Sequence, residues 1–73
     1  MTKAERAIEF LKARGSREVS SSSRKYRKLT VLDNPEKFYW VGKAGAVRVG
    51  KNVGDSISIT DAIERLIKKE ESK

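Results

Sequence analysis

The stretch that most constrains the fold of this chain runs over residues 38–51. Residues 38–41 are all aromatic or β-branched, and residues 46–49 alternate two valines with an alanine and an arginine. Such runs on either side of a glycine-containing break predict two antiparallel strands joined by a tight turn. Gly42 and Gly45 bracket that turn, and either glycine allows a positive φ at no steric cost. The sequence therefore predicts a β-hairpin and leaves its turn geometry open.

The size of the chain allows one small domain, residues 1–73, with a modest core. We expect residues 24–69 to form that core, residues 70–73 to fray, and the domain to be a monomer. There is no cysteine, so a disulfide framework is impossible and the cytosol is the expected compartment. The apolar runs are only a few residues long, and we expect neither a signal sequence nor a membrane contact.

The net charge of +7 is unevenly distributed along the chain. Residues 19–30 contain four basic and no acidic side chains, whereas residues 52–73 contain four basic and five acidic ones. A field of this kind attracts polyanions or the acidic surface of another protein. Charge alone does not distinguish these two kinds of partner.

The pattern at residues 1–15 predicts a short amphipathic helix that ends near Gly15. Thr2 and Glu5 have the spacing of a capping box, and apolar residues then recur at helical intervals. Half of this apolar stripe is alanine, which leaves two alternatives: the helix docks on the sheet, or it becomes ordered only against a partner. Residues 16–23 have no periodicity and include four consecutive serines, so we interpret them as a flexible linker.

The remaining segments predict an α+β fold. β-Prone residues indicate a first strand over 26–32, and the alternation at 56–59 indicates a short fourth strand. A second helix, capped by Thr60 or Asp61, follows with cations near its carboxyl end and should cover the core. The expected architecture is a short N-terminal helix, an antiparallel meander of three or four strands, and a C-terminal helix packed on one face.

Four of the five residues at 24–28 are cations, and they surround Tyr26. This cluster predicts either a solvated strand edge, where charge discourages unwanted pairing, or a recognition patch that the serine run leaves accessible. We expect the cations at 24–28 to capture a partner, Tyr26 and Trp40 to anchor it if they are exposed, and Lys43 and Arg48 to contribute from the hairpin. The candidate partner-binding residues are Arg24, Lys25, Tyr26, Arg27, Lys28, Trp40, Lys43 and Arg48.

The residue types needed for catalysis are largely missing. The chain has neither histidine nor cysteine, and its acidic residues are scattered, so we expect no enzyme activity, no metal site and no cofactor. Residues 45–51 match the spacing of a nucleotide-binding P-loop, but Asn52 stands where Ser or Thr should hold magnesium. The intervening residues also have the pattern of a strand, and we reject the P-loop interpretation.

Three stretches carry a resemblance to known proteins: residues 23–27 (SRKYR), 39–51 (YWVGKAGAVRVGK) and 56–60 (SISIT). They resemble small proteins encoded by tailed phages. In size and basic character the chain is similar to the host RNA-polymerase-binding transcription regulator of a lytic Xanthomonas phage. The resemblance implies a non-enzymatic regulator in the host cell cytoplasm that binds bacterial RNA polymerase, inhibits initiation at host promoters by interfering with the sigma factor, and promotes antitermination. It assigns no contact residue.

Two other functions fit the same residues. A twisted sheet that carries aromatic and basic side chains can bind DNA or RNA, although the chain contains no established nucleic-acid-binding signature. An inhibitor of another host enzyme would use the same surface, and the sequence does not separate it from a polymerase regulator. The sequence thus favours a binding protein and leaves the class of its partner open.

Overall fold

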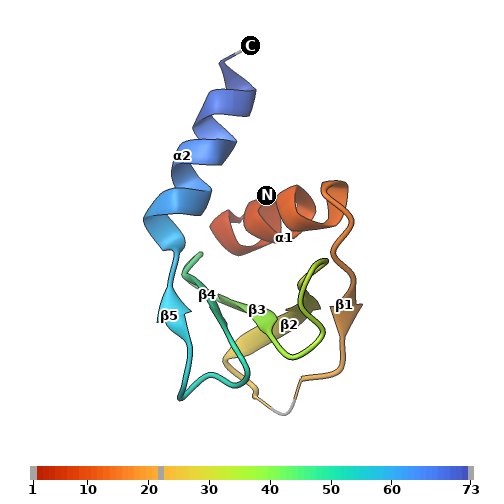
Figure 1. The fold of residues 1–73 in the computed structure, drawn as a ribbon. Helices are drawn as coiled ribbons and strands as arrows, with labels where there is room; N and C mark the ends of the chain where they lie inside the picture. Colours follow the sequence, from red (N-terminus) through yellow and green to blue (C-terminus); the bar gives the residue numbers. More distant parts are fainter. Residues whose placement is uncertain (1, 22, 73) are drawn as a thin grey trace.

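The chain folds into two helices and one five-stranded antiparallel sheet (Figure 1). The computed structural model describes residues 2–21 and 23–72. The strands follow one another across the sheet in chain order, which makes it a meander, and the helices share a core with one of its faces. The predicted α+β class is confirmed, with five strands rather than three or four. In chain order the elements are α1 (Lys3–Ala13), β1 (Glu18–Val19), β2 (Tyr26–Thr30), β3 (Phe38–Gly42), β4 (Val47–Gly50), β5 (Ile57–Ser58) and α2 (Thr60–Glu71).

The predicted hairpin is present as β3 and β4. Its turn is closed by a hydrogen bond of 3.0 Å from the Gly45 N–H to the Gly42 carbonyl, and Gly45 has a φ of +95°. A residue with positive φ after such a turn is typical of three-residue hairpin loops. The turn also contacts α1, because a Cβ atom at Gly45 would lie only 2.6 Å from Cβ of Lys3. Position 45 therefore needs glycine both for its backbone conformation and for space.

The strand register divides the sheet into two faces. Side chains alternate along each strand, and directly paired residues project from the same face. Leu29, Val41 and Val47 share the face that the helices cover, and each is at most 1% exposed. Trp40 precedes Val41 in β3 and therefore projects from the opposite face. The sheet thus has a helix-covered face with the main core and an outer face that carries the tryptophan.

The first helix docks on the sheet, which is one of the two alternatives that its sequence allows. The Thr2 hydroxyl caps it by accepting a hydrogen bond of 3.1 Å from the Glu5 N–H. The Glu5 carboxylate accepts a bond of 3.1 Å from the Thr2 hydroxyl, where a full capping box would use the Thr2 N–H. Two of the buried residues are alanines, which let the helix approach the sheet closely. The buried residues of α1 are Ala4, Ala7, Ile8, Phe10 and Leu11.

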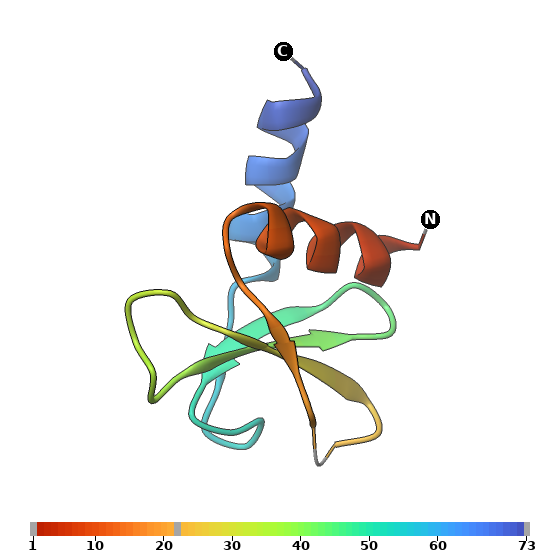
Figure 2. The same cartoon turned by 90° about the vertical axis from the view of Figure 1, so that its right-hand side faces the viewer.

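The second helix contributes less to the core than its sequence predicts. Ile63 is its buried residue, Ile67 is partly buried, and Leu66 is 42% exposed. Figures 1 and 2 show the reason: α1 lies across the sheet, whereas α2 rises away from the sheet beyond its first turns. The main cover of the core is therefore α1, and α2 packs on it through Ile63 and Ile67.

The last turn of α2 is helical rather than frayed. Glu70 forms an ion pair of 2.8 Å with Arg14, and Glu71 forms one of 3.2 Å with Arg6. Both pairs join α2 to α1, and both are exposed, so each contributes little free energy by itself. The expected fraying of residues 70–73 is thus not found at 70 and 71, while residue 73 lies outside the described part of the chain.

The segment 16–23 is not a linker throughout. Glu18–Val19 form β1, which pairs antiparallel with β2. The Arg17 N–H donates to the Thr30 hydroxyl at 3.0 Å, and the Thr30 N–H donates to the Arg17 carbonyl at 2.9 Å. Two residues are too few for a periodic pattern, so this strand exists because the edge of β2 offers it partners. Residue 22, in the serine run, lies outside the described residues.

Two predicted strands are longer than the observed ones. β2 ends at Thr30 rather than at residue 32, and β5 is Ile57–Ser58 rather than 56–59. Both edge strands, β1 and β5, therefore have two residues each. Short edges limit pairing with the strands of other molecules.

Thr60 joins α2 to β4 instead of capping the helix. Its hydroxyl accepts a hydrogen bond of 3.0 Å from the Val47 N–H. The N-cap residue is Ile59, which forms no side-chain capping bond. The predicted cap at Thr60 or Asp61 is therefore wrong, because the threonine hydroxyl satisfies the backbone at the start of β4.

We predict that Thr60→Val lowers the free energy of unfolding by about 1–3 kcal/mol, since the Val47 N–H would lose its partner while the side-chain volume is kept. Urea unfolding followed by tryptophan fluorescence measures the change. Thr60→Ser retains the hydroxyl and should lose clearly less stability. Equal losses in the two variants would show that the hydrogen bond is not the cause.

Candidate functional site

Three cations and one aromatic ring meet at one end of the sheet, and we call this group the basic end: Arg24, Lys25, Tyr26 and Lys43. The register pairs Tyr26 with Gly42, which places the start of β2 beside the β3–β4 turn. Figure 2 shows both segments on the same side of the molecule as the start of α1. The three cations are exposed, and none of them forms an ion pair within residues 2–21 and 23–72. The structure thus brings together four of the eight candidate residues.

Tyr26 lies at the centre of the basic end. Its side chain is half-buried, and a Cβ atom at Gly42 would lie 3.3 Å from Cε1 of the ring, so the ring rests beside the glycine backbone. Tyr26 lines two hollows, one toward the hairpin turn and one toward α1, and its ring lies on the outer face, beside the hollow toward the turn. Lys25 and Lys43 line both hollows. An anionic group bound in either hollow would therefore meet the same two ammonium groups.

The start of α1 adds a cation that is not among the candidate residues. Lys3 is exposed, and its Cβ lies beside the hairpin turn at Gly45. No sequence signal points to Lys3, because its position depends on how the helix docks on the sheet. Docking of α1 therefore brings one more positive charge to the side of the molecule that carries the basic end.

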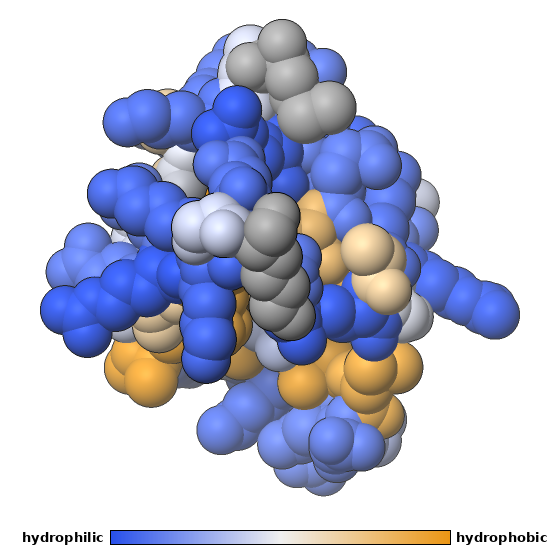
Figure 3. Space-filling view, turned by 90° about the horizontal axis from the view of Figure 1, so that it is seen from above, coloured by the Kyte–Doolittle hydropathy of each residue, from blue (hydrophilic) through white to orange (hydrophobic). Residues whose placement is uncertain are grey.

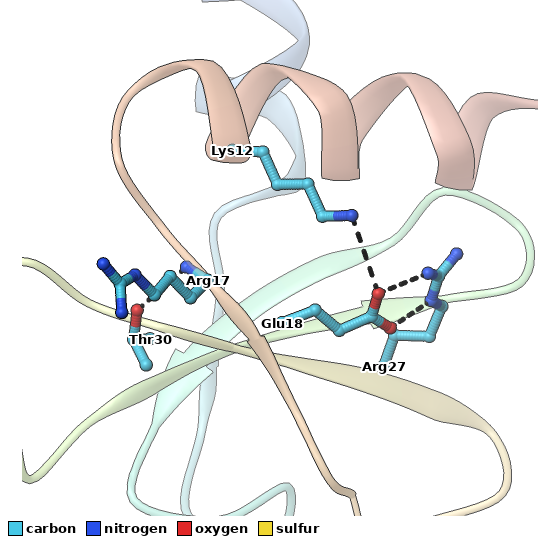
Figure 4. Close-up of polar contacts among 5 residues, drawn as sticks. All are labelled: Lys12, Arg17, Glu18, Arg27 and Thr30. Atoms are coloured by element: carbon cyan, nitrogen blue, oxygen red, sulfur yellow. Dashed lines mark hydrogen bonds and ion pairs between the residues drawn. The ribbon is translucent and has the colours of Figure 1, made fainter.

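Arg27 is engaged within the fold, as Figure 4 shows. Its guanidinium donates two hydrogen bonds to the Glu18 carboxylate. Nζ of Lys12 lies 3.8 Å from the same carboxylate, so the contact joins β2, β1 and α1. The candidate residue Arg27 thus has a structural role in holding β1. The sequence does not reveal this partner, because Glu18 falls in the segment that reads as a linker.

The contact between Glu18 and Arg27 shifts the pKa of both groups. The hydrogen bonds from Arg27 lower the pKa of Glu18, and the charges of Arg27 and Lys12 act in the same direction. The same hydrogen bonds raise the pKa of Arg27. Partial burial opposes the shift in each case. Both shifts favour the charged pair at neutral pH.

Trp40 is 3% exposed and cannot serve as an anchor at the surface. Its Nε1–H donates a hydrogen bond of 3.1 Å to the Gly50 carbonyl, and the Phe38 ring packs edge-on against it. Nζ of Lys28 lies 4.0 Å from the centroid of Phe38 and 5.5 Å from that of Trp40. The lysine thus takes part in cation–π contacts on the outer face of the sheet. The condition attached to Trp40, that it be exposed, is not met.

Arg48 holds a loop against β4. Its guanidinium donates one bond to the Ser56 hydroxyl and one to the Ser56 carbonyl, each of 2.7 Å. Ser56 is itself 7% exposed, and its hydroxyl donates to the Val53 carbonyl at 2.6 Å. These bonds give Arg48 a structural role in holding Ser56 against β4.

The face of the molecule that carries the helices is mostly polar. Figure 3 looks onto the side with the helices and shows hydrophilic side chains over most of it, with separate apolar patches. Among the described residues, no group of three or more His, Cys, Asp or Glu side chains could hold a metal ion. No helix in residues 2–21 or 23–72 is long and apolar enough to cross a membrane. The exposed large apolar side chains lie on different segments and are Val19, Leu32, Ile57 and Leu66.

Comparison of the chain with protein-family models, with curated proteins and with solved structures found no match. We therefore infer a function from the geometry of the chain itself and from the resemblance of its three sequence stretches.

We predict that Glu18 makes the stability of the domain depend on pH. The pKa of Glu18 is lowered in the folded state. Its contribution to the free energy of unfolding is therefore fully present above the ordinary glutamate pKa of 4.5, and it is lost as the pH falls through the lowered pKa. Urea unfolding of the wild type and Glu18→Gln at neutral and acidic pH measures this. The wild type should be the more stable protein at neutral pH, and the difference should shrink in acid. A difference that stays constant would contradict the prediction.

Proposed function

We propose that the chain is a non-enzymatic, phage-type regulator that binds bacterial RNA polymerase in the host cell cytoplasm. In this proposal it inhibits initiation at host promoters by interfering with the sigma factor and promotes antitermination. The resemblance of residues 23–27, 39–51 and 56–60 to tailed-phage proteins supports this function. The first two of these stretches contain all four residues of the basic end.

The observation that carries the proposal is the set of free cations around Tyr26. Arg27 and Arg48 are occupied by Glu18 and Ser56, but Arg24, Lys25 and Lys43 have no ion-pair partner among the described residues. Free cations beside a half-buried tyrosine suit an acidic patch on a protein partner, because tyrosine and arginine are frequent in interface hot spots. Charge complementarity of this kind also speeds association.

A nucleic acid is the second candidate partner, and the half-exposed ring of Tyr26 among lysines favours it. Single-stranded nucleic acids bind best where several aromatic rings stack successive bases. Trp40 is buried and the Phe38 ring is covered by Lys28, so the basic end offers the single ring of Tyr26. The geometry therefore supports a protein partner better than a nucleic acid.

Reversal of two free charges tests the polymerase proposal. We predict that Arg24→Glu with Lys25→Glu weakens capture of purified RNA polymerase by roughly tenfold or more, because both side chains are exposed and would repel an acidic surface. Arg27 is left unchanged, since a glutamate there would face Glu18 and destabilise β1. Binding is measured by pull-down with nuclease-treated components, and an in vitro transcription assay reports initiation and terminator read-through.

A matched control is Lys37→Glu with Lys51→Glu, which makes the same charge change at two exposed lysines beside the Phe38–Gly50 pair, at the opposite end of β3 and β4 from the hairpin turn. This variant should bind nearly as well as the wild type, and both variants should unfold at about the wild-type temperature. Equal weakening by the two variants would show that only net charge matters. Capture that disappears after nuclease treatment would favour the nucleic-acid candidate.

A further inference from the structure

We propose that the basic end binds a short acidic peptide segment in which carboxylates flank one apolar side chain, and that this side chain packs against Tyr26. The inference rests on the proposed function in one respect, that the partner is a protein. It adds the chemistry of the segment that the partner presents.

Positively charged side chains surround Tyr26 at the basic end. Lys25 and Lys43 line the hollows on both sides of Tyr26, and Arg24 lines the hollow toward α1. Lys3 lies beside the hairpin turn, on the same side of the molecule. A ligand that lies against Tyr26 in the hollow toward the turn would therefore meet both Lys25 and Lys43. Carboxylates on either side of a central residue complement this arrangement.

The basic end also has an apolar surface beside these cations. The hollow toward the turn is lined by Ala44, which is exposed, and by Ala46, which is half-buried and lies beside Gly42 as the ring of Tyr26 does. Together with the ring of Tyr26 they form a surface that an aliphatic side chain can cover. Binding sites combine such apolar lining with a few polar groups that fix orientation. A ligand that is anionic throughout would leave this surface without a partner.

The lining of the basic end fits a peptide better than a phosphate backbone. Glu5 lines the hollow toward α1, and its carboxylate would repel a continuous row of phosphates. A peptide can place its acidic side chains at Lys25 and Lys43 and keep them away from Glu5. The mixed lining therefore favours a peptide with spaced carboxylates.

The test uses the full chain, labelled with ¹⁵N, and the acetylated peptide Gly-Asp-Glu-Leu-Glu-Asp-Gly as the probe. Titration should shift the amide signals of Lys25, Tyr26, Lys43 and Ala44 more than those of α2. A second peptide with serine in place of leucine keeps every charge and should bind about fivefold more weakly, because it lacks the apolar contact with Tyr26. A third peptide with Asn and Gln in place of the acids should not bind measurably.

The protein variant for this test is Lys25→Glu with Lys43→Glu, and Lys37→Glu with Lys51→Glu is its control. The first should abolish the shifts and the second should preserve them; all four side chains are exposed, so both proteins should fold. Three results would each overturn the inference: equal affinity for the leucine and serine peptides, shifts spread over α2, or tighter binding of a thymidine decanucleotide at the same salt concentration.

Failure of this inference and failure of the proposed function are distinguishable. If RNA polymerase is captured through the basic end but the leucine peptide has no advantage, the peptide chemistry is wrong and the polymerase partner stands. If the leucine peptide binds as described but polymerase is not captured, the inference holds and another acidic protein is the partner.

Discussion

The docking of α1 on the sheet is the contact on which the rest of this structure depends. Ile8 and Leu11 are 2% and 3% exposed, and they belong to one apolar cluster with Leu29, Val41 and Val47. Burying a large aliphatic side chain contributes about 1.5–3 kcal/mol. A domain of this size has a net stability of only roughly 4–11 kcal/mol, so loss of this contact would remove a large share of it. The same contact brings the start of α1 against the hairpin turn and forms one wall of the basic end.

Much of the fold could be predicted because its signals are local. The hairpin follows from alternation on either side of a glycine turn, and the cap at Thr2 follows from a spacing of three residues. β1 could not be predicted, since a two-residue strand has no period and forms only where β2 provides an edge. Which of the two helices covers more of the core could not be predicted either. It depends on the direction in which α2 leaves the sheet, which no local pattern encodes.

The candidate site divides in the same way. The sequence indicates which residues are cationic or aromatic, but strand register decides which face each one takes. The register places Trp40 on the outer face, where it is buried, and places Tyr26 beside Gly42. Glu18 and Ser56 occupy Arg27 and Arg48, and the candidate cations with neither an ion pair nor a cation–π contact among residues 2–21 and 23–72 are those in the turn and in the bend before β2. A binding surface thus results from what the fold leaves unpaired rather than from the charge cluster as a whole.

The central claim is that α1 and the sheet form one cooperative unit, so that the basic end is preformed in the free protein. Native-state hydrogen exchange, followed by NMR across low urea concentrations, tests this claim most directly. The account predicts that the amides of Ile8 and Leu11 open with the same free energy and urea dependence as the protected amides of β3. The account would be contradicted if the α1 amides exchanged through an opening of much smaller free energy and urea dependence while the β3 amides stayed protected. The helix would then be an element that a partner must order.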